Sequence, residues 1–295
     1  MKRILIANVG STSYKYTVFD VSETCKELVR GGIERVSDYE LAIARSLEDL
    51  AGKGIPKESI DAVAFKTVLG KDLSGLRDAD SKVLDALEAM SYVAPAHNPP
   101  YAAAIRAFAK VLPSARGVVL FETSFYRWAD AAWKRYAVPK SWDEIGIRRN
   151  GFHGASHKFA AERVAELCGE AEAAESARML YVNDGPMKLA KPFRMVNCHL
   201  GGSSSVCGIL NGAAVGSSMG FTPQSGLPQN NRVGDLDSMA IPFAMKTLGI
   251  TAEEAASELS KKGGLLGISG VSNDMRDVRA AAEAGNRDAE LAIDV

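Results

Sequence analysis

The chain has 295 residues, a length typical of two domains that each bury a core. Its 35 basic and 36 acidic residues nearly cancel, which excludes a broad charged surface for nucleic acid or for an anionic membrane. No apolar segment has the length of a membrane span, and the N-terminal apolar run ends in a polar turn rather than at a cleavage site. The four cysteines lack zinc or CxxC spacing, so reduced thiols in a cytoplasmic protein are expected.

The hydrophobic pattern predicts alternating strands and helices along the chain. Strands are expected at 4–9, 14–20, 61–68, 117–121, 194–199, 204–209 and 265–268. Helices are expected at 38–51, 79–91, 99–110, 156–168, 236–247, 251–261 and 274–284. This alternation favours α/β domains with partly parallel sheets. We place the domain boundary near residue 148, giving domains 1–147 and 148–295, and interpret the Ala- and Glu-rich stretch 170–178 as a surface excursion.

The first predicted pair of strands is joined by Gly-Ser-Thr-Ser, residues 10–13. One interpretation is a hairpin turn whose hydroxyl groups satisfy their own backbone. The other is a phosphate cradle, in which Gly10 lets an anion approach the backbone N–H groups and Lys15 supplies positive charge. This turn by itself leaves both interpretations open.

A second polar turn of the same design occurs in the other half of the chain. The stretch RMVNCHLGGSSSVCGIL, residues 194–210, has an apolar strand, two glycines with three serines, and another strand. We interpret the two turns, one in each expected domain, as two halves of a phosphate clamp across a cleft. Neither has the Walker A pattern, and no G-x-G-x-x-G follows a strand and opens a helix, so another phosphate-binding fold is required.

Two histidines lie near the start of the helix expected after residue 155. His153 and His157 flank Ser156, which can cap that helix. The His-x-x-x-His spacing lacks the intervening Glu of a metalloprotease and is a weak zinc signal. The other interpretations are a neutral, hydrogen-bonded histidine at a helix N-terminus and a histidine that faces phosphate.

Two further side chains are candidates for the chemistry. Arg232 lies in a Gly- and Pro-rich loop that is either a solvated loop or part of a site. Glu122 directly follows an apolar strand, the place where open α/β sheets gather site residues, although a helix N-cap contact would also explain it.

Together these stretches resemble the acetate kinase family of the acetate and sugar kinase, Hsp70 and actin superfamily. The resemblance rests on NVGSTSYKY, APAHNPP, RRNGFHGASHKF, CHLGGSSS, SSMGFTPQSGL, NNRVGDLD and LGISGVSNDMRD, which occur in the family's order along the whole chain. It implies two ribonuclease-H-like α/β domains flanking a cleft. It also implies transfer of the γ-phosphoryl group of ATP, with Mg²⁺, to a short carboxylate such as acetate, giving an acyl phosphate and ADP in a homodimeric enzyme. Propionate or butyrate is the alternative acceptor.

The resemblance also implies a role for individual residues. The expected catalytic residues are Arg232, His153, Glu122 and Lys66. The acyl group is expected to contact Lys66, Phe152 and Pro223. The expected contacts of ATP and its phosphates are Ser11, Ser13, Lys15, His199, Gly201, Gly202, Asp274, Met275 and Arg276. Asn8 is expected near the Mg²⁺.

The chain departs from the family pattern at several of these positions. Lys66 stands where the family has arginine, Glu122 where it has aspartate, and Gly202 where it has asparagine. Lysine keeps the charge of arginine but not the fork that grips a carboxylate. These changes favour an altered substrate, a slower enzyme or a relative that binds nucleotide without catalysis. Family members also continue beyond the position of Val295, so the second domain is expected to be incomplete.

Overall fold

The computed structural model describes residues 2–10, 13–94 and 97–295. It consists of two compact units, Met1–Arg127 and Trp128–Val295, and both combine strands with helices. This arrangement confirms the α/β class expected from the alternating pattern. Ser11 of the first polar turn lies outside the described residues.

The first unit is built on a six-stranded mixed sheet. In spatial order its strands are β3 (Lys26–Glu34), β2 (Ser13–Asp20), β1 (Arg3–Val9), β4 (Ala62–Thr67), β6 (Arg116–Phe121) and β5 (Leu76–Asp78). The central pairs β1–β4 and β4–β6 are parallel, whereas the outer pairs are antiparallel. All four strands expected in this unit are present within a residue or so of their predicted ends, whereas the edge strands β3 and β5 were not predicted.

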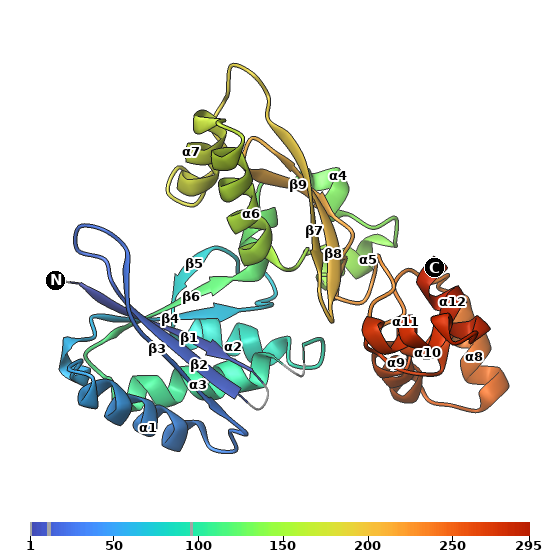
Figure 1. Ribbon diagram of the computed structural model, residues 1–295, viewed down its shortest axis with the longest axis horizontal. Helices are drawn as coiled ribbons and strands as arrows, with labels where there is room; N and C mark the ends of the chain where they lie inside the picture. Colours follow the sequence, from blue (N-terminus) through green and yellow to red (C-terminus); the bar gives the residue numbers. More distant parts are fainter. Residues whose placement is uncertain (1, 11–12, 95–96) are drawn as a thin grey trace. The chain divides into compact units, whose positions relative to one another are not determined.

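Three helices cover one face of this sheet (Figure 1). They are α1 (Tyr39–Gly52), α2 (Ser81–Ala89) and α3 (Asn98–Val111). Alternate strand residues point into the core beneath them, as Leu5, Ala7 and Val9 of β1 do, with exposed fractions of 0–3%. Because side chains alternate across a strand, the residues between them, Asn8 among them, point to the opposite face.

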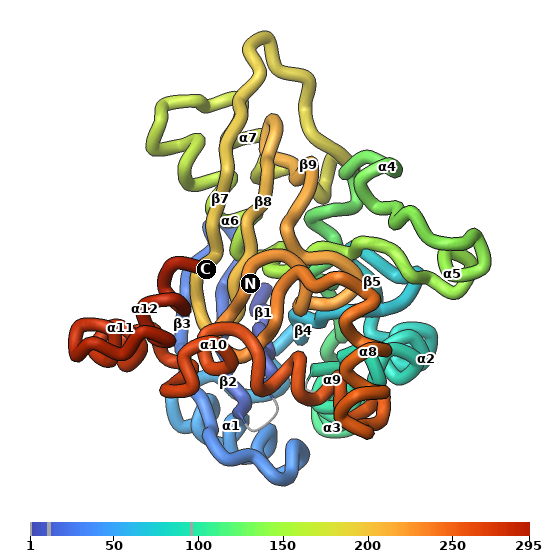
Figure 2. Tube along the Cα trace, turned by 90° about the vertical axis from the view of Figure 1, so that its right-hand side faces the viewer, coloured from blue at the N-terminus to red at the C-terminus, as the bar shows by residue number. Residues whose placement is uncertain are grey.

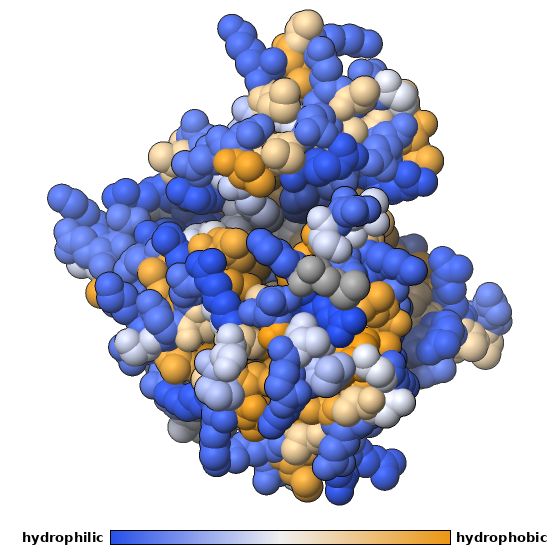
Figure 3. Space-filling model, turned by 90° about the vertical axis from the view of Figure 1, so that its left-hand side faces the viewer, coloured by the Kyte–Doolittle hydropathy of each residue, from blue (hydrophilic) through white to orange (hydrophobic). Residues whose placement is uncertain are grey.

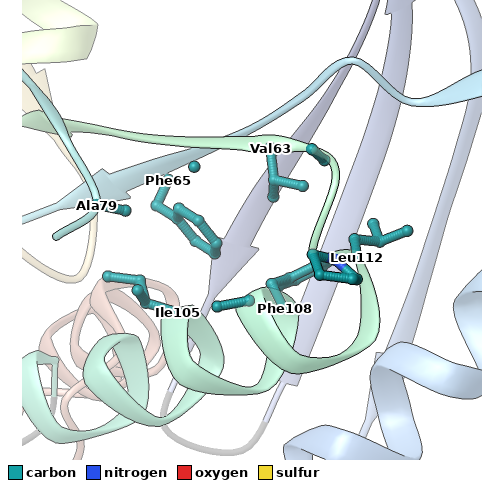
Figure 4. A pocket seen from close by; sticks show the side chains of 10 residues that line it. Val63, Phe65, Ala79, Ile105, Phe108 and Leu112 are labelled. Atoms are coloured by element: carbon teal, nitrogen blue, oxygen red, sulfur yellow. The ribbon is translucent and has the colours of Figure 1, made fainter.

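A small gap in this core lies between α3 and the sheet (Figure 4). Phe65, Phe108, Ile105 and Leu112 line it together with other apolar residues. The lining offers no charged side chain, so we interpret the gap as imperfect packing rather than as a reaction site.

The second unit has a three-stranded antiparallel sheet of adjacent strands (Figure 2). Its strands are β7 (Arg194–Leu200), β8 (Ser204–Leu210) and β9 (Ala213–Ser217). Helix α6 (Gly154–Leu167) packs on β7 and β9, and α7 (Ala171–Met179) packs on α6. The first two strands were predicted correctly, while β9 was missed.

The interpretation of residues 170–178 as a surface excursion was wrong, because this stretch forms α7. Ala173, Ala174 and Ala177 are buried, and their small side chains let α7 lie close to α6. The absence of large apolar residues hid an amphipathic pattern whose buried face is made of alanine.

The rest of the second unit is helical. Its elements are α4 (Ala131–Lys134), α5 (Lys140–Glu144), α8 (Ala240–Leu248), α9 (Ala252–Lys261), α10 (Gly264–Ser269), α11 (Met275–Glu283) and α12 (Arg287–Asp294). The strand expected at 265–268 was wrong, since these residues form α10. A short apolar run fits a buried strand or a buried helix equally well, and here Gly264 and Gly270 begin and end a helical turn with positive φ.

The two units divide between Arg127 and Trp128, before the boundary placed near residue 148. The segment 128–147 is bonded to the rest of the second unit. The guanidinium of Arg149 donates to the carbonyl groups of Trp133 and Arg135 at 2.9 and 2.8 Å. The hydroxyl of Tyr136 likewise accepts a bond from the backbone N–H of Phe221.

The surface is mostly hydrophilic on the face drawn in Figure 3, with apolar atoms in smaller patches. Across the described ranges, no helix combines the length and apolar character needed to cross a membrane.

Candidate active site

The first unit carries a row of polar side chains across four neighbouring strands. Asn8 of β1 pairs with Lys15 of β2, and Ala7 pairs with Phe65 of β4, so Lys66 follows on the same face as Asn8. Lys66 is paired with Leu120 of β6, and Glu122 comes two residues later. Because Lys15, Asn8 and Lys66 alternate with core residues, they lie on the face opposite the three helices. Glu122, which follows β6, is joined to this row through Lys66.

Lys66 and Glu122 form an ion pair with a Nζ to Oε1 distance of 2.7 Å. The side chain of Glu122 is only 10% exposed, whereas that of Lys66 is 41% exposed. The pair is thus half-sheltered from water, with the carboxylate as its buried member. Glu122 begins the short 3₁₀ helix Glu122–Tyr126, so it is the first helical residue, and the N-cap residue is Phe121.

The turn between β1 and β2 is held by backbone and tyrosine contacts. The N–H of Gly10 donates to the carbonyl of Ser13 at 2.7 Å, and the hydroxyl of Tyr39 donates to the carbonyl of Gly10. The hydroxyl of Tyr101 lies 3.5 Å from Oδ1 of Asn8. Ser13 is thus placed at the hairpin closure by its backbone.

Lys15 lies at the exposed end of the polar row. Its Nζ is 3.8 Å from Glu34, and both side chains are more than 60% exposed. Such a pair contributes little to stability, so the ammonium group of Lys15 can turn to another anion at low cost.

The second unit brings together three of the chain's four histidines. The rings of His153 and His199 stack with centroids 3.9 Å apart, and His157 lies 6.3 Å from each. His153 precedes α6 in a left-handed conformation with φ of 57°, which is strained for a residue with a side chain.

The expectation that Ser156 caps α6 was wrong. The helix begins at Gly154, its N-cap residue His153 makes no side-chain cap bond, and the hydroxyl of Ser156 instead contacts Nδ1 of His199 at 2.9 Å. His153 and Ser156, which were expected at the start of this helix, therefore both direct their side chains into the histidine cluster.

A buried serine and an asparagine complete this cluster. Oγ of Ser205 lies 2.8 Å from Nδ1 of His153 and 2.8 Å from Nε2 of His157. Nδ2 of Asn197 lies 2.7 Å from Nδ1 of His157. His157 and Ser205 are fully buried, and burial, aided by the nearby His199, lowers the pKa of His157 to about 4. His157 is therefore neutral at pH 7.

Arg232 lies in a loop of the second unit and is bonded to neutral groups. Its Nη1 donates to Oγ of Ser203 at 3.0 Å and to Oε1 of Gln229 at 3.4 Å. Burial lowers the pKa of its guanidinium, which nevertheless stays charged. Within the described part of the chain, no carboxylate lies in ion-pairing distance of Arg232. A sheltered cation with only neutral acceptors is well suited to hold an anion.

Gln229 connects three parts of this loop system. Its Oε1 accepts from Ser203 at 2.9 Å, and its Nε2 donates to the carbonyl of Pro223 at 2.7 Å. Its backbone carbonyl accepts from the N–H of Leu265 in α10. Gln229 is only 2% exposed, so these bonds fix the loop from within.

The glycines of the turn between β7 and β8 face Asn230. A Cβ atom on Gly202 would lie 3.1 Å from Nδ2 of Asn230, while one on Gly201 would lie 3.9 Å from Nε2 of His199. The space beside Gly202 is thus occupied by the amide of a loop residue. Phe152, expected in the acyl pocket, is 1% exposed, and Pro223 is half-buried.

The segment expected beside adenosine begins α11. Asp274 is the N-cap residue, accepting from the backbone N–H of Arg276, whose guanidinium also bonds the carboxylate at 2.9 Å. This guanidinium lowers the pKa of Asp274 to about 2. Arg276 is 89% exposed, and Met275 is the first helical residue and is also exposed.

The residues that support these candidates were not predicted from the sequence. Ser205, Asn197, Ser203 and Gln229 contact the histidines or Arg232 but were not singled out. The serines were visible only as part of a Ser-rich turn. Neither the asparagine in β7 nor the glutamine in the loop has a pattern that separates it from an ordinary polar residue.

A phosphate-handling α/β enzyme is the class that this fold and these groups define. The acetokinase family model matches residues 35–295. The acetate kinase of Bacillus subtilis (strain 168) is 34% identical over 326 aligned residues, covering 100% of this chain and 76% of that protein. The acetate kinase of Geobacillus sp. (strain WCH70) is also 34% identical, with the same coverage.

Solved structures agree with the sequence comparison. Porphyromonas gingivalis acetate kinase has a TM-score of 0.80 at 29% identity, covering 99% of this chain and 76% of that one. A propionate kinase from Francisella tularensis has a TM-score of 0.78 at 26% identity, covering 100% and 77%. The chain belongs to the acetokinase family. This confirms the resemblance, the actin- and sugar-kinase-like fold and the class of phosphotransferases with a carboxyl acceptor, which use ATP and Mg²⁺.

Proposed function

We propose that this protein transfers the γ-phosphoryl group of ATP directly to a short-chain carboxylate, acetate in the first instance. A carboxylate oxygen attacks the γ-phosphorus in line, the bond to the β–γ bridging oxygen breaks, and ADP leaves with that oxygen's electron pair. The observation that carries the proposal is Arg232, a sheltered guanidinium whose bonds are to neutral groups in a family that handles phosphate. One well-placed arginine can accelerate phosphoryl transfer by roughly a thousandfold or more.

The remaining residues of the second unit take supporting parts in this proposal. Arg232 stabilises the charge that develops on the transferring group, and His153 donates a hydrogen bond to its equatorial oxygens. His199 at the end of β7 and Gly201 and Gly202 of the following turn receive the ATP phosphates, with Asn230 adding an amide beside Gly202. Asp274, Met275 and Arg276 lie beside the adenosine.

The first unit supplies the acceptor and metal sides of the reaction. Lys66 attracts the carboxylate substrate, while Phe152 and Pro223 of the second unit limit the size of its acyl group. Ser11, Ser13 and Lys15 contact phosphate. Glu122 and Asn8 offer a carboxylate and an amide oxygen on one sheet face, the donor types that suit Mg²⁺ when nucleotide phosphates and water complete its shell. The bound ion would neutralise phosphate charge.

A propionate- or butyrate-type specificity is the second candidate. It is supported by the similarity to a propionate kinase and by Lys66, which holds a carboxylate with a point charge rather than a fork. A homodimer remains part of the proposal and is tested by light scattering during size-exclusion chromatography.

The reaction is tested by trapping acyl phosphate with hydroxylamine. Purified protein, ATP and Mg²⁺ are mixed with acetate, propionate or butyrate in parallel, and the acyl hydroxamate is measured. Arg232→Ala should abolish product. Arg45→Ala, which removes the same charge from the exposed face of α1, should leave it unchanged. Nucleotide binding by a folded protein that makes no acyl phosphate from any of the acids would overturn the proposal in favour of a binding protein.

A further inference from the structure

The histidine cluster contains polar side chains that have no part in the proposed reaction. His153 is assigned to the phosphoryl group, but the fully buried His157 and Ser205 behind it have no part in that assignment. Asn197 of β7 closes the far end of the same line of contacts. Four polar side chains, from α6 and its N-cap residue, β7 and β8, are thus connected in series, with three contacts of 2.7–2.8 Å.

The direction of each hydrogen bond in this series is set by its first member. The side-chain nitrogen of Asn197 can only donate, so Nδ1 of His157 is the acceptor. A neutral imidazole that accepts at Nδ1 carries its proton on Nε2, which therefore donates to Oγ of Ser205. The Ser205 hydroxyl, having accepted from His157, donates its own proton to Nδ1 of His153. The ring proton of His153 is then on Nε2.

We infer that Asn197, His157 and Ser205 are positioning residues that hold His153 in its neutral form with the proton on Nε2. The catalytic consequence rests on the proposed function, because only a protonated Nε2 can donate to a phosphoryl oxygen while Nδ1 is occupied by Ser205. The series also disfavours the imidazolium form of His153. In the imidazolium form, Nδ1 of His153 would carry a second proton, and this proton would point at Oγ of Ser205. The buried hydroxyl proton of Ser205 would then lose its acceptor.

The buried end of the series is stable in the form that this inference requires. His157 has no exposed surface, and its low pKa keeps it neutral over the pH range in which enzymes of metabolism work. It can therefore act as both acceptor and donor, which an imidazolium cannot.

The inference is tested first by nitrogen NMR of the wild-type protein labelled in its four histidines. At pH 8, both His153 and His157 should show an unprotonated Nδ1 and a protonated Nε2. A proton on Nδ1 of either ring would overturn the inference. This measurement does not depend on activity, so it stands even if the protein makes no acyl phosphate, and the failure of one proposal is distinguishable from the failure of the other.

Two pairs of variants then test the catalytic consequence. Ser205→Ala should lower kcat by about five- to tenfold, the effect of losing one hydrogen bond, with the KM for ATP changed less than twofold. The matched control is Ser176→Ala, which removes another fully buried serine hydroxyl of the same unit, bonded to the carbonyl of Asn211 rather than to a histidine. Its kcat per folded molecule should equal that of the wild type.

The second pair separates hydrogen bonding from packing at residue 157. His157→Gln places an amide N–H where the ring Nε2 donates, and should keep kcat within about twofold, while His157→Leu fills the space without a donor and should lose about five- to tenfold. Equal losses in the two variants, with folded fractions matched by circular dichroism, would show a structural role only and overturn the inference.

Discussion

The two strand–turn–strand loops look alike in sequence but differ in how their polar groups are held. In the first unit, Lys15 is exposed and makes a long ion pair with Glu34. In the second unit, Ser203 contacts Gln229 and Arg232, and Gln229 is almost completely buried. The first loop thus presents an exposed charge at the surface, whereas the second fixes a cation with neutral hydrogen bonds.

This difference indicates a division of labour between the two regions. A charge that is fixed before the reaction stabilises a transition state without reorganisation, and it is worth more where water is excluded. An exposed charge attracts a ligand but is screened by salt. We therefore expect the groups of the second unit to govern the rate, and those of the first unit to govern binding and local stability.

Arg232 gives the largest expected effect. Arg232→Lys should lower kcat by about a hundredfold or more, because the ammonium group keeps the charge but cannot maintain the bonds of a guanidinium to Ser203 and Gln229 while contacting phosphate. Steady-state kinetics with ATP and acetate measure this effect. A loss below tenfold would mean that charge alone suffices and that the fixed geometry of the second loop is unimportant.

The buried histidine gives the next largest effect, on stability rather than rate. An unfolded histidine titrates near pH 6.5, whereas the pKa of His157 in the fold is about 4. Between these values the unfolded chain binds a proton that the folded chain does not, so stability falls as the pH drops through this window, by about 3 kcal/mol in total. Stability should be unaffected by this group above pH 7.

Urea unfolding at pH 7, 5.5 and 4 checks this expectation. His157→Gln has no titrating ring, so its stability should decline less steeply over this range than that of the wild type, by the same amount of about 3 kcal/mol. Parallel pH dependence of the two proteins would show that folding does not lower the pKa of His157, and would count against its burial as a neutral ring in the hydrogen-bonded series.

Much of the first unit could be predicted from sequence, because its strands alternate buried and exposed residues or follow one another as apolar runs. Strand β1 shows this directly, with Leu5, Ala7 and Val9 buried and Asn8 exposed. The edge strand β3 could not be recognised, since its residues are exposed or half-buried and include a Gly-Gly pair. Packing on one side only leaves such a strand without a strong apolar signal.

The candidate site was predictable only where a motif carried it. His153 and Arg232 lie in distinctive loops and His199 lies at the end of β7, and the structure places the two histidines in ring contact. The roles of Ser205 and Gln229 depend on contacts between segments 25 or more residues apart, such as those joining Ser205 to the two helix-start histidines. No local pattern encodes such contacts: those of Ser205 arise from the packing of α6 on the sheet, and those of Gln229 with Ser203 and Ser204 join the loop to the turn before β8.

The ion pair of the first unit gives a smaller effect. Lys66→Met leaves the largely buried carboxylate of Glu122 without its cation and should lower stability by about 1–2 kcal/mol, a modest amount because Lys66 is partly exposed to water. The KM for the carboxylate should rise about tenfold, the cost of a lost charged hydrogen bond. Adding Glu122→Gln should recover the stability but not the KM.

A matched control tests whether the loss of any exposed ammonium group would change stability or the KM for the carboxylate. Lys82→Met removes an exposed ammonium group from α2 and should change neither stability nor KM. If Lys66→Met leaves the KM for every acid tested unchanged, the pair is structural, and the acceptor carboxylate is held elsewhere.

Lys15 gives the smallest effect and the sharpest contrast with the second loop. Lys15→Ala should change stability by less than about 0.5 kcal/mol, because its pair with Glu34 is long and exposed. The KM for ATP should nevertheless rise about three- to fivefold at low salt, and this difference should shrink as salt screens an exposed charge. Lys26→Ala, an exposed lysine of β3, serves as control and should leave the KM unchanged. A salt-independent rise for Lys15→Ala would mean that bound nucleotide shelters this ammonium group from solvent, and that the first loop also holds its charge in a fixed place during the reaction.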